Sequence, residues 1–285
     1  MDGLELIIFL FSCPYAIYAI GKWYISLVKI WPPERRKTVN LIFGALPVIS
    51  FIMIYYTLRV LASFDVVNDG VYIFFYLILG LTWVYLGMRM VFRYFDLSWI
   101  DDGLSLNNKS AAIAIAGAFL GLTVIYSGAN VGDGPGWWCV IIAGGMGLIA
   151  WFVLGKILNK YTHIFERVTV DRDIYCGIRL CAYLLASGLI LGRASAGDWT
   201  SFFDTIVEFL VGWPAIILTI LAILIERYYI HKDKLIDNRN HNDVIGSLFW
   251  SIVYIAIAVA SIMMFPLVEN PLYGSGLAGL LGAIL

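Results

Sequence analysis

Long apolar runs, separated by short polar segments, recur along the whole 285-residue chain. Each run has about 20 residues, which as an α-helix crosses a hydrocarbon core of about 30 Å. A helix also pairs its own backbone groups, as the membrane interior demands. The pattern predicts an all-α polytopic membrane helical bundle with eight spans, at residues 4–21, 39–63, 71–92, 110–129, 137–158, 174–196, 202–225 and 244–266.

The two ends of the chain give weaker patterns. The tail at 271–285 is apolar and Gly-rich but short, so a re-entrant piece, a half-helix and a ninth span all stay open. At the N-terminus, the first apolar run has neither a basic region before it nor an A-x-A cleavage motif after it. We therefore expect the first span to be retained rather than cleaved as a signal.

Composition supports the membrane prediction and narrows the function. The chain is 61% hydrophobic and 14% charged, whereas soluble domains are about 25% charged. The four cysteines lie in spans, at spacings that fit neither a zinc site nor a disulfide framework. Nucleotide-binding and common hydrolase motifs do not occur. We expect no enzyme activity, no cofactor, no metal site and no nucleic-acid partner.

The distribution of Lys and Arg predicts the orientation, because these residues favour the cytoplasmic side of a membrane. With the N-terminus outside, 16 of the 19 basic residues fall in inner segments. The exceptions are Arg59 and Arg193 at outer helix ends and Arg179 within a span. The opposite orientation would place nearly all the positive charge outside. We therefore predict a multi-pass protein whose N-terminus is outside.

A transition from polar to small residues recurs where four of the spans begin. It reads KTVNLIFG near Gly44, NNKSAAIA near Ala112, DRDIYCGI near Gly177 and NHNDVIGS near Gly246, at separations of 68, 65 and 69 residues. Each transition opens a span that runs outward, and the next span returns. This predicts repeated two-helix hairpins of one orientation, although a regular series of unrelated hairpins would give similar spacing.

The polar and small residues at these transitions have separate uses. Asn and Asp accept hydrogen bonds from the free N–H groups of a helix start, which predicts caps at Asn40, Asn108, Asp173 and Asn242. Small residues let helix backbones approach in a bilayer, where close packing drives association. The predicted packing residues are Ala112, Ala116, Gly117, Gly121, Ala143, Gly147, Gly188 and Gly192.

The segment NNKSAAIAIAGAFLGLTVIYSGA, residues 107–129, resembles the asparagine-then-small-residue helix of the YjfL-like bacterial inner-membrane proteins, whose function is unassigned. A four-span module typical of that family would cover about 71–197, between N-terminal spans at 1–70 and a C-terminal part at 198–285. The second copy departs from the family pattern, because DRDIYCGIRL places Arg179 inside the helix. The resemblance implies a bacterial inner-membrane location and brings no catalytic residue.

Arg179 is the first of the candidate functional residues. A charge at the centre of a span costs about 2.5–3.5 kcal/mol on insertion scales and marks function by default. Its position near the inner interface also permits the side chain to reach back to the headgroups, and the ring of Tyr183 lies one turn further on. A pathway role and a structural pairing both stay open.

Asp204 and Glu208 form a second candidate, at positions i and i+4 on one face of span seven. That face continues through Gly212 and Ala215, and Pro214 interrupts the span. The arrangement is typical of the outer mouth of a cation or proton path. The alternative is a structural ion pair with Arg193 or Arg59.

Two basic segments complete the candidates. Residues 231–243 combine histidines and aspartates without metal-ligand spacing and read as a solvated loop. Residues 22–40 mix aromatic and basic side chains, which suits anionic lipid headgroups but also an ordinary inner loop.

Three functional hypotheses follow. The leading one is a non-enzymatic inner-membrane protein for membrane homeostasis or envelope stress, or an assembly platform, in a homo-oligomer or with other membrane proteins. The alternative is an ion or small-molecule transporter or channel with a path near Arg179, Asp204 and Glu208. A lipid-processing enzyme is the weakest, because it needs several titratable groups gathered in one groove.

Overall fold

The protein is an all-helical bundle in the computed structural model, which describes residues 3–30, 37–236 and 244–267. Within these ranges, eight helices are long and apolar enough to cross a membrane, which confirms the predicted fold class. The predicted cap Asn242, the tail at 271–285 and most of the 231–243 loop lie outside the described residues. The long helices are α1 (Gly3–Lys29), α2 (Lys37–Val60), α4 (Gly70–Phe95), α5 (Lys109–Ala129), α6 (Trp137–Thr162), α8 (Ile174–Ala194), α10 (Pro214–Ile236) and α11 (Val244–Met264).

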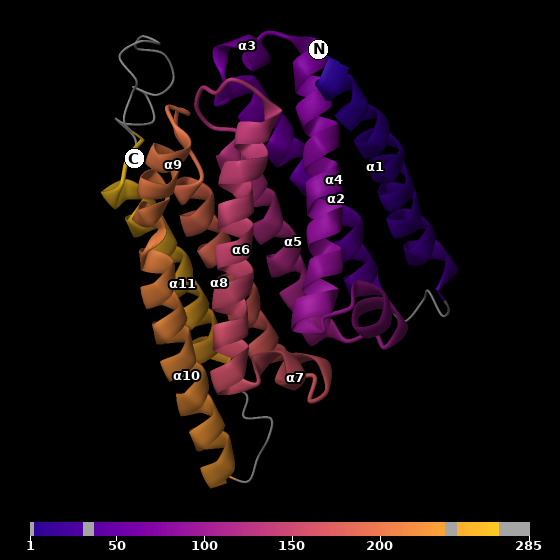
Figure 1. The fold of residues 1–285 in the computed structure, drawn as a ribbon. Helices are drawn as coiled ribbons and strands as arrows, with labels where there is room; N and C mark the ends of the chain where they lie inside the picture. The colour runs from indigo at the N-terminus through magenta and orange to yellow at the C-terminus, as the bar shows by residue number, and fades with distance from the viewer. Residues whose placement is uncertain (1–2, 31–36, 237–243, 268–285) are drawn as a thin grey trace.

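The eight long helices form two layers (Figure 1). In one layer α2, α5, α8 and α11 pack side by side in that order. The other layer contains α1, α4, α6 and α10, with α1 against α4 and α6 against α10. Chain order alternates between the layers, so all helices of one layer run in one direction and those of the other run back.

Short helices connect the long ones. They are α3 (Phe64–Val67), the π-helix η2 (Trp99–Ser105), α7 (Ile164–Thr169), α9 (Phe202–Phe209) and the 3-10 turn η3 (Leu210–Gly212). α9 and η3 precede α10, so the predicted span seven begins with a separate short helix. Pro214 is the first residue of α10, a position where proline costs no internal hydrogen bond.

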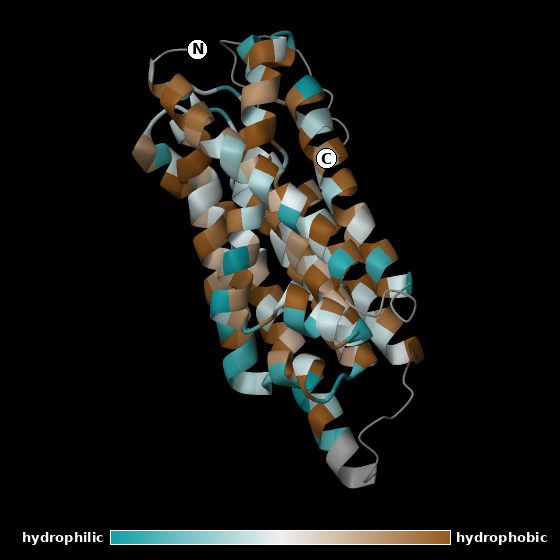
Figure 2. Ribbon diagram, turned by 90° about the vertical axis from the view of Figure 1, so that its right-hand side faces the viewer, coloured by the Kyte–Doolittle hydropathy of each residue, from teal (hydrophilic) through white to brown (hydrophobic). Residues whose placement is uncertain are grey.

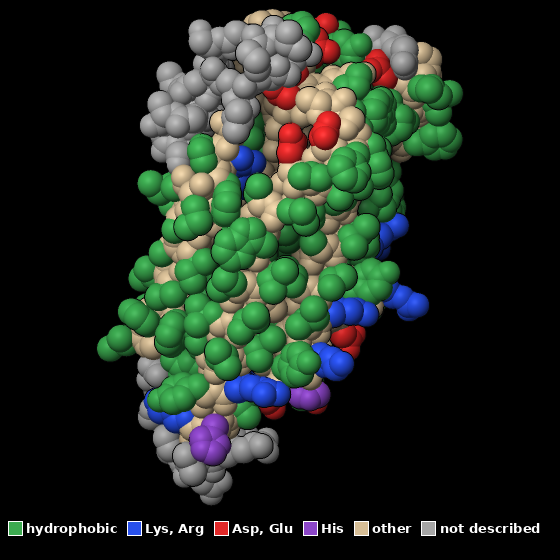
Figure 3. Space-filling view, turned by 60° about the vertical axis from the view of Figure 1, so that its left-hand side comes forward, with side chains coloured by type: hydrophobic (Ala, Val, Ile, Leu, Met, Phe, Trp, Pro, Cys, Tyr) green, Lys and Arg blue, Asp and Glu red, His purple; other side chains and the backbone are tan. Residues whose placement is uncertain are grey.

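The two ends of the bundle differ in charge (Figure 3). The end that holds the start of α1, α3 and α9 carries Asp65, Asp69, Asp133, Asp198 and Asp204, and we call it the acidic end. The opposite end carries Lys22, Arg93, Lys109, Lys160 and Arg167 among others, and we call it the basic end. Hydrophobic residues cover much of each long helix between these ends (Figure 2).

The centre of the bundle is a glycine contact between the parallel helices α5 and α8. A Cβ atom on Gly188 would lie 2.7 Å from the Cα of Gly121, and one on Gly117 would lie 2.6 Å from the Cα of Cys181. A Cβ on Gly192 would lie 2.8 Å from the carbonyl oxygen of Val124. Side chains larger than hydrogen are excluded here, so the two backbones touch directly.

The other predicted packing residues lie around this contact. Ala112 and Ala143 are buried, and Ala116 packs against the same core while part-exposed. Gly147 of α6 faces α8, since a Cβ there would lie 2.7 Å from the hydroxyl oxygen of Ser195. That hydroxyl donates a hydrogen bond to the carbonyl of Ala143 at 3.1 Å, which joins α6 to the end of α8.

The segments 70–132 and 137–197 correspond in detail. α4 and α6 each have 26 residues, and α5 and α8 each have 21. α4 and α6 each end at a residue of left-handed conformation, Asp96 and His163. A residue of positive φ, Asn107 or Arg172, precedes the start of α5 and α8.

Candidate functional site

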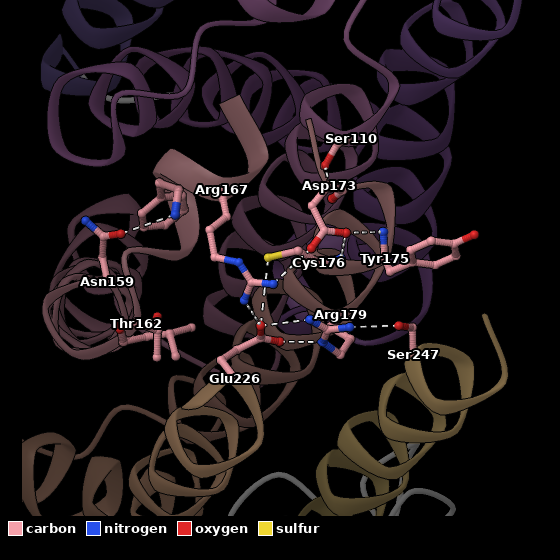
Figure 4. Close-up of polar contacts among 12 residues, drawn as sticks. Ser110, Asn159, Thr162, Arg167, Asp173, Tyr175, Cys176, Arg179, Glu226 and Ser247 are labelled. Atoms are coloured by element: carbon pink, nitrogen blue, oxygen red, sulfur yellow. Dashed lines mark hydrogen bonds and ion pairs between the residues drawn. The ribbon is translucent and has the colours of Figure 1, made fainter. Parts of the chain in front are cut away.

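A buried charge network lies near the basic end, between α7, α8, α10 and α11 (Figure 4). Its central cation is Arg179 of α8, with 2% of its surface exposed. Glu226 of α10 is 1% exposed and accepts two hydrogen bonds from this guanidinium, one from Nε and one from Nη2 at 2.8 Å. The two-pronged contact neutralises a charge that insertion into the bundle would otherwise leave unpaired.

Glu226 also joins a second arginine to the network. The Oε2 atom of Glu226 accepts a hydrogen bond from Nη1 of Arg167 at 2.9 Å, and Nη2 of Arg167 pairs with Asp173 at 2.9 Å. Burial alone would lower the pKa of Arg167, but the neighbouring Cys176, Glu226 and Asp173 outweigh it and raise that pKa. The network therefore holds two guanidinium groups against two carboxylates and has no net charge.

Polar and aromatic groups complete the surroundings of Arg179. Its Nη1 atom donates to the hydroxyl of Ser247 on α11 at 2.7 Å, and its guanidinium carbon lies 4.0 Å from the ring centroid of Tyr229. Tyr183, which the sequence suggested as the aromatic partner, instead shares a hydrogen bond with Thr219 at 2.9 Å. The network thus fixes both C-terminal helices, α10 and α11, to α8.

The predicted caps of α5 and α8 lie at the same end and make additional contacts. The Asn108 side chain accepts from the amide of Ala111 and donates to the carbonyl of Val168 at 2.8 Å. Asp173 accepts from the amides of Tyr175 and Cys176 at 3.0 Å each, with its other oxygen on Arg167. Each cap therefore also ties its helix to α7 or to the network.

The cap prediction for α2 is wrong. Asn40 lies in the first turn of that helix, three residues after Lys37, rather than before its first residue. Its Oδ1 atom is buried and accepts no hydrogen bond from the described residues. The polar-to-small transition KTVNLIFG therefore begins inside the helix, because Lys37 and Thr38 are already helical.

Asp204 and Glu208 lie far from the network, at the acidic end. Both are exposed on α9, and the Asp204 carboxylate accepts from the hydroxyls of Thr200 and Ser201 at 3.0 and 2.7 Å. Glu208 lines a small cavity of about 50 Å³ that Asp198 also lines. In the described part of the chain neither acid forms an ion pair.

The arginines that the sequence offered as partners for these acids bind backbone carbonyls instead. Arg193 donates from Nε and Nη2 to the carbonyls of Phe265 and Pro266 at 2.7 and 2.8 Å, which holds the end of α11. Arg59 donates to the carbonyl of Val67 at 2.8 Å. The structure therefore separates Arg179 from Asp204 and Glu208 instead of bringing them together.

Neither Glu226 nor Arg167 is among the functional residues that the sequence predicts. The predicted span seven ends at residue 225, which assigns Glu226 and Arg227 to an inner loop. In the structure α10 continues as one helix to Ile236, so Glu226 is inside the bundle. One signal could have identified Glu226. It directly follows the apolar run of span seven, and the buried Arg179 needs an acid from a neighbouring helix.

Comparison with known proteins identifies a match to a domain family whose function is not assigned. Residues 56–190 match the family model described as Domain of Unknown Function (DUF350). That range covers α4, α5, α6 and most of α8, and it includes Arg167, Asp173 and Arg179. Neither the curated proteins nor the solved structures gave a match.

The chemistry open to this site follows from its composition. Its titratable groups are a charge-balanced set already engaged with one another. In the described residues no group of three or more His, Cys, Asp or Glu is placed to hold a metal ion. The site is a buried salt-bridge network that connects helices.

Proposed function

We propose that this protein is a non-enzymatic integral protein of the bacterial inner membrane that serves as an assembly platform in membrane homeostasis or envelope stress. The observation that carries the proposal is the closed core, with α5 and α8 in backbone contact through Gly121 and Gly188. Because α5 and α8 are in direct contact and Arg179 is paired, the described part of the bundle leaves no polar path between these helices. Such a rigid bundle is better suited to binding partner proteins than to conducting a solute.

Further parts of the proposal concern origin and orientation. The segment at 107–129 supports membership of the YjfL-like proteins, and it lies within the range 56–190 that matches the domain of unknown function. The equal helix lengths in 70–132 and 137–197 support a duplicated unit. The N-terminus begins α1 at the acidic end, which by the positive-inside rule favours an outside N-terminus.

The platform role is tested in native membranes. The tagged chain is cross-linked in its own membrane, extracted into nanodiscs and sized, with partners identified from replicate preparations. We expect a defined homo-oligomer or one recurrent membrane-protein partner. A monomer without any reproducible cross-linked species would overturn the proposal.

A transporter or channel is the second candidate, because Glu208 and Asp198 line a cavity at the acidic end and Tyr254 has a buried hydroxyl without a partner among the described residues. Its test is ion and proton flux in proteoliposomes. Flux that falls in Glu208→Gln but persists in Asp69→Asn, a control acid at the same end, would favour the pathway. Background flux in the wild type would exclude it for the ions tested.

A further inference from the structure

A groove at the basic end is lined by cationic and phenolic side chains that are not part of the buried charge network. It lies between α1, α4 and η2 and has a volume of about 300 Å³. The lining residues are Tyr15, Tyr18, Ala19 and Lys22 of α1, Tyr85, Met88, Arg89 and Phe92 of α4, and residues 98–101. Both helices contribute positions i, i+3, i+4 and i+7, so each presents one continuous face to the groove.

Two cations in this groove have no acidic partner among the residues that the structure describes. Lys22 and Arg89 are exposed, and in the described part of the chain neither forms an ion pair. Arg89 makes a cation–π contact with Tyr15, at 5.1 Å from its guanidinium carbon to the ring centroid. Lys and Arg side chains at the edge of a membrane attract anionic headgroups.

Two phenols in the same groove have hydroxyls without a hydrogen-bond partner in the described ranges. The hydroxyl oxygens of Tyr15 and Tyr85 are buried and make no hydrogen bond with the described residues. Tyr85 is only 6% exposed, and it lines the groove. A buried polar group without a partner is costly and calls for an explanation such as a missing ligand. Both rings line the groove, so a small movement of either ring would bring its hydroxyl to an acceptor-rich group bound there.

The groove also contains one acid, Asp101. Its Oδ2 atom accepts from the hydroxyl of Ser98 at 2.7 Å, which fixes the carboxylate at the groove's edge. Two cations and one carboxylate suit a ligand that has an anionic phosphodiester and hydroxyl donors beside it. The exposed apolar rims Tyr18 and Phe92, 56% and 52% exposed, suit acyl chains.

We propose that this groove binds the headgroup of an anionic, hydroxyl-bearing glycerophospholipid such as phosphatidylglycerol. Lys22 and Arg89 contact the phosphodiester, the phenols of Tyr15 and Tyr85 donate to its oxygens, and Asp101 accepts from the headgroup hydroxyls. This site goes beyond the platform role, because lipid binding can be measured whether or not the protein has protein partners.

The test is native mass spectrometry of the full chain with phosphatidylglycerol, phosphatidylethanolamine or phosphatidylcholine added singly. The variants are Lys22→Gln/Arg89→Gln and a charge-matched control, Lys160→Gln/Arg227→Gln, whose side chains lie exposed at the same end but outside the groove. We expect phosphatidylglycerol affinity to fall about tenfold or more in the groove variant and to stay within about twofold in the control.

Other outcomes would overturn the proposal. Equal loss in both variants would mean diffuse attraction by the basic end, and equal binding of the three lipids would remove headgroup recognition. Full competition by millimolar inorganic phosphate would indicate a free-phosphate site instead. The single change Lys22→Gln guards against misfolding, because Lys22 is exposed and forms no hydrogen bond or ion pair with the described residues. This change alone is expected to weaken binding severalfold.

Discussion

Glu226 is the residue on which the buried network depends most. It accepts from both Arg167 and Arg179, whereas Arg167 has a second carboxylate in Asp173. Among the described residues Arg179 pairs with no other acid, since its remaining hydrogen bond goes to the hydroxyl of Ser247. Substituting Glu226 should therefore destabilise the protein more than substituting Arg179.

We predict that Glu226→Gln destabilises the protein more than Arg179→Met does. The first change leaves a buried guanidinium without a carboxylate, which costs on the order of 3–5 kcal/mol. The second leaves Glu226 paired with Arg167. The double variant removes both charges and should melt above Glu226→Gln alone, measured by thermal unfolding in detergent. Strictly additive losses would contradict a direct pair.

Of the Arg179–Glu226 pair, only Arg179 can be predicted from the sequence. Arg179 stands out as a charge in an apolar run, and its need for a partner follows from that alone. The partner lies 47 residues away on α10, at a position that local hydropathy assigns to a loop. Which of several acids meets an arginine depends on how helices pack, and no short-range pattern carries that information.

Among the helices, the α5–α8 contact follows directly from residue size. The small residues predicted for packing include Gly117, Gly121, Gly188 and Gly192, and these four lie where the two backbones meet. The sequence also predicted all eight spans. It did not predict that α9 forms a separate helix, because its apolar run continues through the 3-10 turn into α10.

We predict that Gly188→Ala destabilises the protein by about 1–3 kcal/mol, because its methyl group would overlap the backbone of Gly121. The matched control is Gly145→Ala on α6, where a Cβ would meet nothing within 4 Å. That change should be neutral or slightly stabilising, since alanine favours a helix over glycine. Thermal unfolding of both variants in one detergent compares them. Equal melting temperatures would contradict direct backbone contact.

The molecule has an acidic end and a basic end. Because Lys and Arg favour the cytoplasmic side of a membrane, we predict that the basic end faces the cytoplasm. Thr200→Cys and Asp171→Cys place single thiols in exposed loops at the acidic and basic ends. In intact cells a membrane-impermeant maleimide should label the first and not the second, with both labelled after permeabilisation. The parent chain gives the background from its four native cysteines. The reverse pattern would contradict the orientation.

The most direct test of the central claim, that this is a closed platform rather than a conduit, is an experimental map of the full chain in lipid nanodiscs. We predict that the map shows α5 and α8 in contact at Gly121 and Gly188, with Glu226 between Arg167 and Arg179. We also expect the map to show a defined contact with a second copy or a partner. A water-filled polar path that separates α5 from α8 and reaches Arg179 would contradict the claim.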